Sequence, residues 1–195
     1  MKIGLYFGSF NPIHNGHIHI AQEALSQCDL GEVWLMVSPQ NPFKKASDLA
    51  PEEDRLNMAR IACEGFRNIH VSDIEFSLPR PSFTITTLKK LCSDFPENTF
   101  YLILGEDNIG SLNQWKDITE LLTIVEVIVY PRAGSDSVFP SELKAFNDKF
   151  QWLKGKHIEV SATEVRHHLK AGLPLHTMLH VGVAEYILSH HLYSS

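Results

Sequence analysis

The first 25 residues of the chain change abruptly from a strand-like to a helix-like pattern, and this change constrains the fold more than any other feature. Lys2 to Phe7 form a short apolar run typical of a buried strand, and the following Gly-Ser-Phe-Asn-Pro at 8–12 favours a tight turn. From about Asn15 onward, apolar residues recur every three or four positions, which indicates an amphipathic helix. Free N–H groups and the positive dipole end of such a helix suit a bound phosphate. We therefore predict a strand, a turn and a helix that together form an anion site.

Two histidines lie at the expected start of this helix. His14 and His17 are three residues apart, so both rings can face one bound anion, and Gly8 and Gly16 leave room for a ligand near the backbone. An ordinary pair of surface histidines beside a βα turn is the alternative. A zinc pair fits less well, because two histidine ligands on one helix usually sit four residues apart and no cysteine is nearby.

The composition favours a globular cytoplasmic protein. At 195 residues the chain is long enough for one domain with a sizeable core, and its net charge of −6 disfavours nucleic-acid or membrane partners. Its cysteines, Cys28, Cys63 and Cys92, are odd in number and form no CxxC pair, so we expect buried thiols in a reducing compartment. No stretch resembles a signal peptide or a membrane span.

Strand-like and helix-like segments alternate along the rest of the chain, a pattern typical of an α/β protein with a parallel sheet. Further strands are expected at 32–38, 99–104, 124–130 and 157–160, with short extended pieces at 68–72 and 74–76. Helices are expected at 51–65, 81–91, 161–170 and 180–193. The segment 135–155 has a less regular pattern, a polar loop followed by a short helix near 141–150.

Polar side chains follow several of these strands, at the edge where open parallel sheets bind their ligands. Lys44 and Lys45 follow the second strand, Asp107 follows the strand at 99–104, and Arg132 follows the strand at 124–130. Each has an ordinary alternative, because the cations could be solvated and Asp107 could cap a short helix.

A second anion site is predicted at the start of the helix at 161–170. Ser161, Thr163 and the first helix amides can bind a phosphate, and Arg166 adds a cation one turn later. A capped helix with a surface arginine is the alternative.

Residues 8–17, GSFNPIHNGH, resemble the signature of the nucleotidyltransferase superfamily with the (T/H)xGH motif, and the chain is similar to bacterial nicotinate-nucleotide adenylyltransferases within it. Three further segments resemble that family in the same order: PSFTITTL at 81–88, GEDNIGSLNQW at 105–115 and SATEVR at 161–166. The chain departs from the family at Phe83, where tyrosine is usual, at Ala162, where serine is usual, and at Phe43, where a histidine usually precedes the cation.

The resemblance covers nearly the whole chain and implies a fold. It implies one Rossmann-like nucleotidyltransferase domain over residues 1–195, with an open parallel sheet of order 3-2-1-4-5 and helices on both faces. The last segment, 183–193, is similar to the family's closing V-x-x-Y-I-x-x-x-x-L-Y and is expected to be structural. The chain lacks G-x-G-x-x-G and G-x-x-x-x-G-K-[ST], which disfavours a classical dehydrogenase and a P-loop kinase.

The resemblance also implies a reaction, in which AMP passes from ATP to nicotinate mononucleotide and gives deamido-NAD and pyrophosphate in NAD biosynthesis. The attacking phosphate is already anionic, so such a site needs cations and backbone donors rather than a nucleophilic side chain. Mg²⁺ would arrive on ATP, held mostly by phosphate and water, and no protein metal site is expected. The expected partners are these small substrates, and a homo-oligomer is left open.

Roles for individual residues follow from the same resemblance. The catalytic residues would be His14, His17, Lys44 and Arg166, with Lys45 as the alternative to Lys44. Contacts to ATP would come from Gly8, Ser9, Phe10, His14, Gly16, His17, Gly105, Asp107, Ser161, Thr163 and Arg166. Contacts to nicotinate mononucleotide would come from Asn11, Lys44, Thr84, Asp107 and Trp115. Considered alone, Ser82 or Thr84 would more often cap the helix than bind a ligand, and Trp115 could equally be a core residue.

Other functions remain open from sequence. The nearest is an adenylyltransferase that prefers nicotinamide mononucleotide or accepts both pyridine nucleotides, because the two bases differ only in a carboxylate or an amide. Phosphopantetheine adenylyltransferases usually lack the segments resembling 81–88 and 105–115. A nucleotide sensor without catalysis is disfavoured by the presence of His14, His17 and Arg166. A zinc hydrolase built on the eleven histidines is the weakest alternative.

Overall fold

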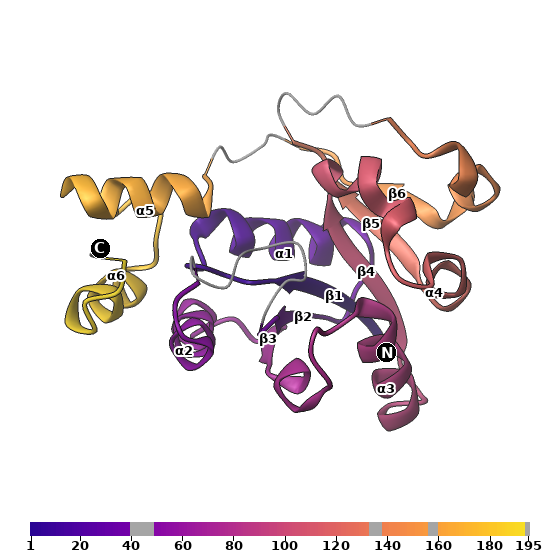
Figure 1. Ribbon diagram of the computed structural model, residues 1–195, viewed down its shortest axis with the longest axis horizontal. Helices are drawn as coiled ribbons and strands as arrows, with labels where there is room; N and C mark the ends of the chain where they lie inside the picture. Colours follow the sequence, from indigo (N-terminus) through magenta and orange to yellow (C-terminus); the bar gives the residue numbers. More distant parts are fainter. Residues whose placement is uncertain (40–48, 133–137, 156–159, 194–195) are drawn as a thin grey trace.

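One parallel sheet forms the centre of the molecule (Figure 1). The computed structural model describes residues 1–39, 49–132, 138–155 and 160–193. Within these residues six strands have the order β3-β2-β1-β4-β5-β6, and every neighbouring pair is parallel. The strands are β1 (Lys2–Gly8), β2 (Glu32–Val37), β3 (Ile69–Ser72), β4 (Thr99–Gly105), β5 (Glu126–Tyr130) and β6 (Phe150–Trp152).

Helices connect these strands, as parallel pairing requires. The α-helices are α1 (Asn15–Gln27), α2 (Glu52–Ala62), α3 (Thr84–Asp94), α4 (Ile118–Ile124), α5 (Ala162–Ala171) and α6 (Val181–Ser189). Short 3₁₀ helices lie at η2 (Ile74–Ser77), η3 (Glu106–Gln114) and η4 (Ser141–Lys149). Among the described residues no helix is both long enough and apolar enough to cross a membrane.

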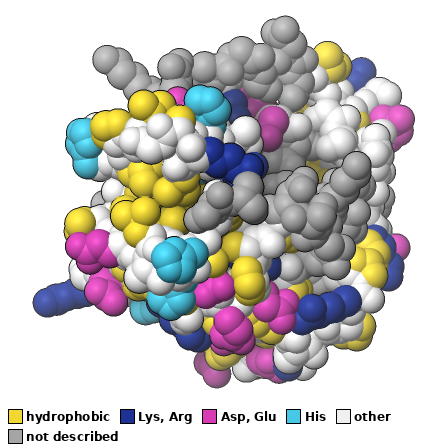
Figure 2. Space-filling model, turned by 60° about the vertical axis from the view of Figure 1, so that its left-hand side comes forward, with side chains coloured by type: hydrophobic (Ala, Val, Ile, Leu, Met, Phe, Trp, Pro, Cys, Tyr) yellow, Lys and Arg dark blue, Asp and Glu magenta, His cyan; other side chains and the backbone are white. Residues whose placement is uncertain are grey.

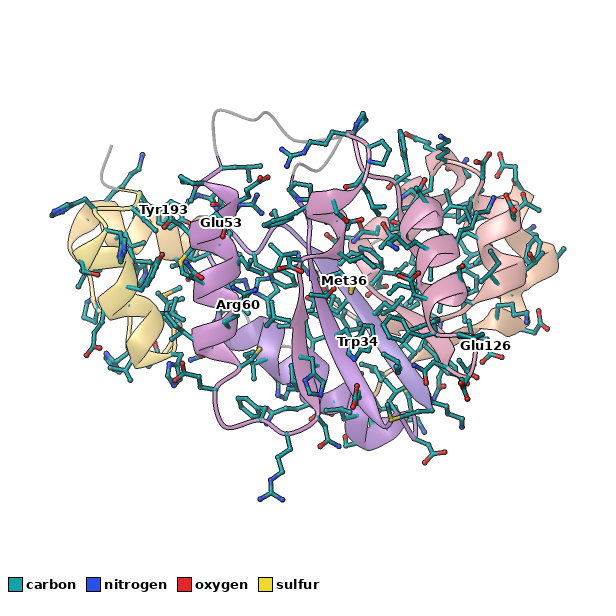
Figure 3. All side chains as sticks on the ribbon, turned by 90° about the horizontal axis from the view of Figure 1, so that it is seen from below. Trp34, Met36, Glu53, Arg60, Glu126 and Tyr193 are labelled. Atoms are coloured by element: carbon teal, nitrogen blue, oxygen red, sulfur yellow. The ribbon has the colours of Figure 1, made fainter. Side chains whose placement is uncertain are left out.

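The sheet has an apolar core on each face, because side chains alternate along its buried strands. Along β2, Val33 and Leu35 join the core with α1, α2, α5 and α6. Trp34 and Met36, labelled in Figure 3, join the opposite core with α3 and α4. The prediction of helices on both faces is therefore confirmed.

The predicted sheet order 3-2-1-4-5 is also confirmed, with β6 added beside β5. Sequence reasoning missed β6 because it has only three residues and directly follows η4. The extended piece expected at 74–76 is wrong, since this segment forms η2. There Glu75 turns inward, where its carboxylate accepts hydrogen bonds from the hydroxyls of Ser82 and Thr87. The strand expected at 157–160 lies outside the described residues except for Val160, which is not in a strand.

The C-terminal helices lie together at one side of the molecule, on the left in Figure 1. α6 packs on α2. The Tyr186 hydroxyl donates to Asp54 Oδ1 at 2.9 Å and accepts from Asn57 Nδ2 at 3.2 Å. This contact brings the end of the chain close to the carboxyl edge of β1 and β2, where the turn at 8–14 begins.

Candidate active site

The turn between β1 and α1 buries its own side chains against the end of the strand. Phe10 is buried and adopts a left-handed backbone conformation, with φ of 43°. A Cβ at Gly8 would lie 2.9 Å from the Phe10 ring, so only glycine allows the ring to fold back on the strand end. Ser9 is buried too. Gly8, Ser9 and Phe10 therefore shape the turn, as their place in the motif suggests.

The two motif histidines stack on one another at the start of α1. Their ring centroids are 3.7 Å apart and the rings are tilted by 26°. The backbone N–H of His14 donates to Nδ1 of His17 at 3.1 Å, so neutral His17 carries its proton on Nε2. The Phe10 ring packs edge-on against His17 at 5.0 Å. Both rings thus have fixed orientations, and both line the cavity described below.

Burial distinguishes His14 from its neighbour. Only 6% of His14 is exposed, and burial lowers its pKa to about 4, with the positive charge of Arg132 contributing. Its Nδ1 is buried and has no hydrogen-bond partner in the part of the chain that the structure describes. A buried polar atom without a partner at the rim of a cavity is a natural contact for a ligand.

The segment at 160–166 meets the histidines from the other side. A Cβ at Gly16 would lie 3.0 Å from the His14 ring and 3.5 Å from the carbonyl oxygen of Val160, so glycine permits this close approach. Ser161 caps α5 by accepting a hydrogen bond from the N–H of Glu164 at 3.1 Å. Ser161 therefore caps the helix, and it also lines the cavity described below.

Arg166 connects two motifs that are 155 residues apart in sequence. One guanidinium nitrogen donates to the carbonyl oxygen of Asn11 at 2.7 Å, and the other donates to Thr163 Oγ1 at 3.2 Å. Arg166 is half-buried and is thus not a freely solvated surface arginine. The cation is held directly beside the turn that leads to His14.

A cavity of about 300 Å³ opens between α1, the carboxyl ends of β5 and β6, and the start of α5. His14, Gly16, His17 and Ser161 are among the residues that line it. On one face of the molecule, Lys and Arg side chains gather near the centre, beside an apolar area bordered by histidines (Figure 2). The cavity, which histidine and cationic side chains line, is suited to a nucleotide.

Arg132 extends this set of cations. It lines the cavity, and its guanidinium lies 3.5 Å from the carboxylate of Asp107 and 3.4 Å from the Tyr130 hydroxyl. A Cβ at Gly105 would lie 2.8 Å from the same hydroxyl, so glycine is needed where β4 ends. Arg132 therefore projects over the cavity and is not simply solvated. Asp107 lies in the first turn of η3 and faces Arg132 at the edge of this site.

The residues expected to bind the mononucleotide are more dispersed. Thr84 is the first residue of α3, whose N-cap is Phe83, and Trp115 directly follows η3 and packs against the core on the α3 and α4 face. Neither lines the cavity beside the histidines. Asn11 is buried, and its side-chain oxygen accepts hydrogen bonds from Ala50 N and from the Tyr193 hydroxyl. Lys44 and Lys45 lie outside the described residues.

Sequence reasoning missed Arg55, which is 1% exposed in α2. Its guanidinium donates to the carbonyl oxygens of Ser9, Ser38 and Pro39 at 2.6–2.7 Å, and its Nε donates to Ala50 at 3.0 Å. It thereby ties together the chain segments that follow β1 and β2. A charged residue directly before Leu56, on the apolar side of the predicted helix, was the available signal.

Comparison with known proteins agrees with this geometry. The model of the cytidylyltransferase-like family matches residues 5–168. The chain is 41% identical over 193 residues to a protein of Flavobacterium johnsoniae, covering 99% of both chains, and 42% identical over 195 residues to one of Cytophaga hutchinsonii, covering all of both. Both relatives are named probable nicotinate-nucleotide adenylyltransferases.

Solved structures show the same fold. The nicotinic acid mononucleotide adenylyltransferase of Plasmodium falciparum, complexed with NaAD, matches with a TM-score of 0.79 at 21% identity, covering 98% of this chain and 97% of that one. A putative nicotinate-nucleotide adenylyltransferase of Vibrio parahaemolyticus matches with a TM-score of 0.72 at 19% identity, covering 100% and 96%.

The family match and the paired histidines together define a nucleotidyltransferase. Since relatives more than 40% identical cover the whole chain, it belongs to the cytidylyltransferase-like family and, within it, to the nicotinate-nucleotide adenylyltransferases.

Proposed function

We propose that the protein transfers AMP from ATP to nicotinate mononucleotide, giving deamido-NAD and pyrophosphate. The observation that carries this proposal is the hydrogen bond from Arg166 to Asn11, which brings the cation of the second anion site against the turn that leads to the paired histidines of the first. The full-length relatives named for this activity support the choice of substrates.

The proposed chemistry needs no side-chain nucleophile. A phosphate oxygen of nicotinate mononucleotide attacks the α-phosphorus of ATP, and the bond from that phosphorus to the bridging oxygen of the β-phosphate breaks. The electron pair leaves with pyrophosphate, so negative charge grows on the leaving group. Positioning and fixed positive charge therefore supply most of the rate.

The described residues suit these demands at one end of the cavity. The triphosphate lies at the amino end of α1, where the positive end of the helix dipole favours an anion and the Nε2 proton of His17 can donate to it. His14 contributes the other stacked ring, and Arg166 stabilises the charge on the β- and γ-phosphates. Ser161 and Thr163, beside Arg166, provide the hydroxyl contacts in this proposal.

The acceptor would approach from the side of the sheet that carries α3 and η3. Thr84 and Trp115 lie at the start of α3 and the end of η3, and a flat indole face suits a pyridine ring. Asp107 at the carboxyl end of β4 is an acceptor for ribose hydroxyls. Lys44 is proposed to bind the phosphate of the mononucleotide.

We infer that ATP enters as its Mg²⁺ complex. Mg²⁺ prefers oxygen ligands and keeps several waters, whereas the charged and aromatic side chains that this proposal assigns to the phosphates are imidazole and guanidinium groups. The ion would therefore be held by ATP and water. The proposal also includes a cytoplasmic location and small molecules as the partners. It makes no choice between a monomer and a homo-oligomer.

The test is product formation by the purified protein. With ATP, Mg²⁺ and nicotinate mononucleotide, deamido-NAD and pyrophosphate should appear in equal amounts, measured by chromatography and a coupled pyrophosphate assay. Binding of ATP without formation of a dinucleotide would contradict the proposal and would favour a nucleotide sensor.

A further inference from the structure

The C-terminal segment reaches the turn at 8–14. After α6, the chain turns back through His191 and Tyr193, whose φ angles of 51° and 63° are left-handed. Residues other than glycine adopt this conformation only where their surroundings hold them. Figure 3 shows Tyr193 beside the end of α2 that carries Glu53. Its hydroxyl donates a hydrogen bond of 2.8 Å to the side-chain oxygen of Asn11.

Asn11 connects the turn at 8–14 to three other parts of the chain. Its side-chain oxygen accepts from the Ala50 N–H at 2.9 Å, just before α2, and from Tyr193 at the end of the chain. Its main-chain oxygen accepts from the Arg166 guanidinium at 2.7 Å. The residue is 5% exposed, so these hydrogen bonds are shielded from water.

The direction of influence follows from these contacts. The side-chain oxygen of Asn11 accepts hydrogen bonds from Tyr193 and Ala50, and its main-chain carbonyl oxygen accepts one from Arg166. Burial raises the pKa of Tyr193, so its hydroxyl remains a protonated donor across the physiological range. Loss of this donor would remove one of the two hydrogen bonds that hold the Asn11 side chain, and would thereby loosen the residue whose carbonyl oxygen receives Arg166.

We propose that Tyr193 is a positioning residue for adenylyl transfer, which fixes the Asn11 peptide and, through it, the phosphate-binding guanidinium of Arg166. This inference rests on the proposed function of the site. It gives the closing tyrosine of the chain, which the sequence analysis treats as structural, a role in ATP binding and turnover.

The chain offers a matched control in Tyr186. Its hydroxyl also attaches the C-terminal segment, but it contacts Asp54 and Asn57 in α2 rather than the turn at 8–14. Tyr193→Phe and Tyr186→Phe each remove one hydroxyl from this part of the molecule. A purely structural role of the segment would affect both variants alike.

The experiment measures the dissociation constant of Mg²⁺–ATP by calorimetry, kcat for pyrophosphate release, and the melting temperature of each variant. Y193F should weaken ATP binding and lower kcat, each by about threefold to tenfold, as expected for one lost hydrogen bond. Y186F should keep both values within about twofold while lowering the melting temperature. Wild-type ATP affinity and kcat in Y193F, or equal losses in both variants, would overturn the proposal.

A double-mutant cycle tests the route through Arg166. In an Arg166→Ala background, Y193F should change ATP affinity by less than about twofold, because the group it positions is absent. An undiminished effect in that background would overturn the route. The calorimetric readout needs no acceptor, so a wild-type protein that binds ATP but forms no deamido-NAD would contradict the proposed function alone.

Discussion

At the scale of single residues, the two motif histidines are not equivalent. His17 has a fixed proton position because its Nδ1 accepts from the backbone of His14. His14 is buried, and its pKa of about 4 makes it neutral at pH 7 before substrate binds. Among the described residues, positive charge near the predicted phosphate position comes from Arg166 beside the turn at 8–14 and from Arg132 and Lys154 at the cavity.

The burial of His14 predicts a pH-dependent stability. In the unfolded chain its pKa returns to about 6.5, so the unfolded state binds more protons between pH 6.5 and 4. Stability from this group is complete above pH 6.5 and is lost as the pH falls, by about 2 kcal/mol at pH 5. Urea unfolding of wild type and His14→Asn at pH 7 and pH 5 measures the loss of unfolding free energy. The variant should lose about 2 kcal/mol less than wild type between the two pH values. An equal pH dependence in both proteins would contradict the lowered pKa.

Replacement of His17 tests its role on the phosphates. His17→Ala should lower kcat for pyrophosphate release by roughly tenfold to a hundredfold, because one charge-assisted contact is lost as charge develops. Its melting temperature should change little, since the ring is only half-buried. His167→Ala, on the exposed side of α5, is the control and should keep wild-type turnover. A folded H17A protein with wild-type kcat would remove His17 from the mechanism.

At the scale of elements, α2 organises the loops beneath the site through one buried side chain. Arg55 donates to carbonyl oxygens that follow both β1 and β2, and to Ala50 just before its own helix. Without this guanidinium, the carbonyl oxygens of Ser9, Ser38, Pro39 and Ala50 would each lose a hydrogen-bond donor. The helix thus acts as a support for the turn at 8–14 rather than as a simple connection.

Arg55→Met should therefore be strongly destabilising, by about 3 kcal/mol or more, because several buried carbonyl groups lose their partner. Arg60→Met on the same helix is a matched control, since Arg60 makes only an exposed ion pair with Asp73 (Figure 3 labels Arg60). That control should cost less than about 1 kcal/mol. Denaturant unfolding of both variants measures the difference, and similar losses in the two would contradict the role assigned to Arg55.

Much of the element pattern was predictable from sequence, because long strands and helices with clear periodicity identify themselves. β1, β2, β4 and β5 are examples, and the histidine motif at the start of α1 was found directly. The three-residue β6 was missed because so short a segment carries no periodicity. The inward turn at Glu75 depends on hydroxyl donors at 82 and 87, which local pattern cannot reveal. Arg55 and Tyr193 were missed as functional residues because their partners are backbone or side chains far away in sequence.

At the scale of the whole molecule, the site is assembled from segments distant in sequence. The first turn supplies the histidines, the β4 and β5 ends supply Asp107 and Arg132, and α5 supplies Arg166. All of them meet at the carboxyl edge of the sheet, where open parallel sheets bind ligands. Only the complete fold brings these charges together, so the activity should disappear together with the cooperative unfolding of the chain.

The most direct test of the central claim compares acceptors with the intact protein. Pyrophosphate release is measured with ATP and Mg²⁺ and with equal concentrations of nicotinate mononucleotide, nicotinamide mononucleotide or phosphopantetheine. We predict turnover with nicotinate mononucleotide that far exceeds turnover with the other two. Equal rates with both pyridine nucleotides, faster turnover of phosphopantetheine, or no release with any acceptor would contradict the assignment.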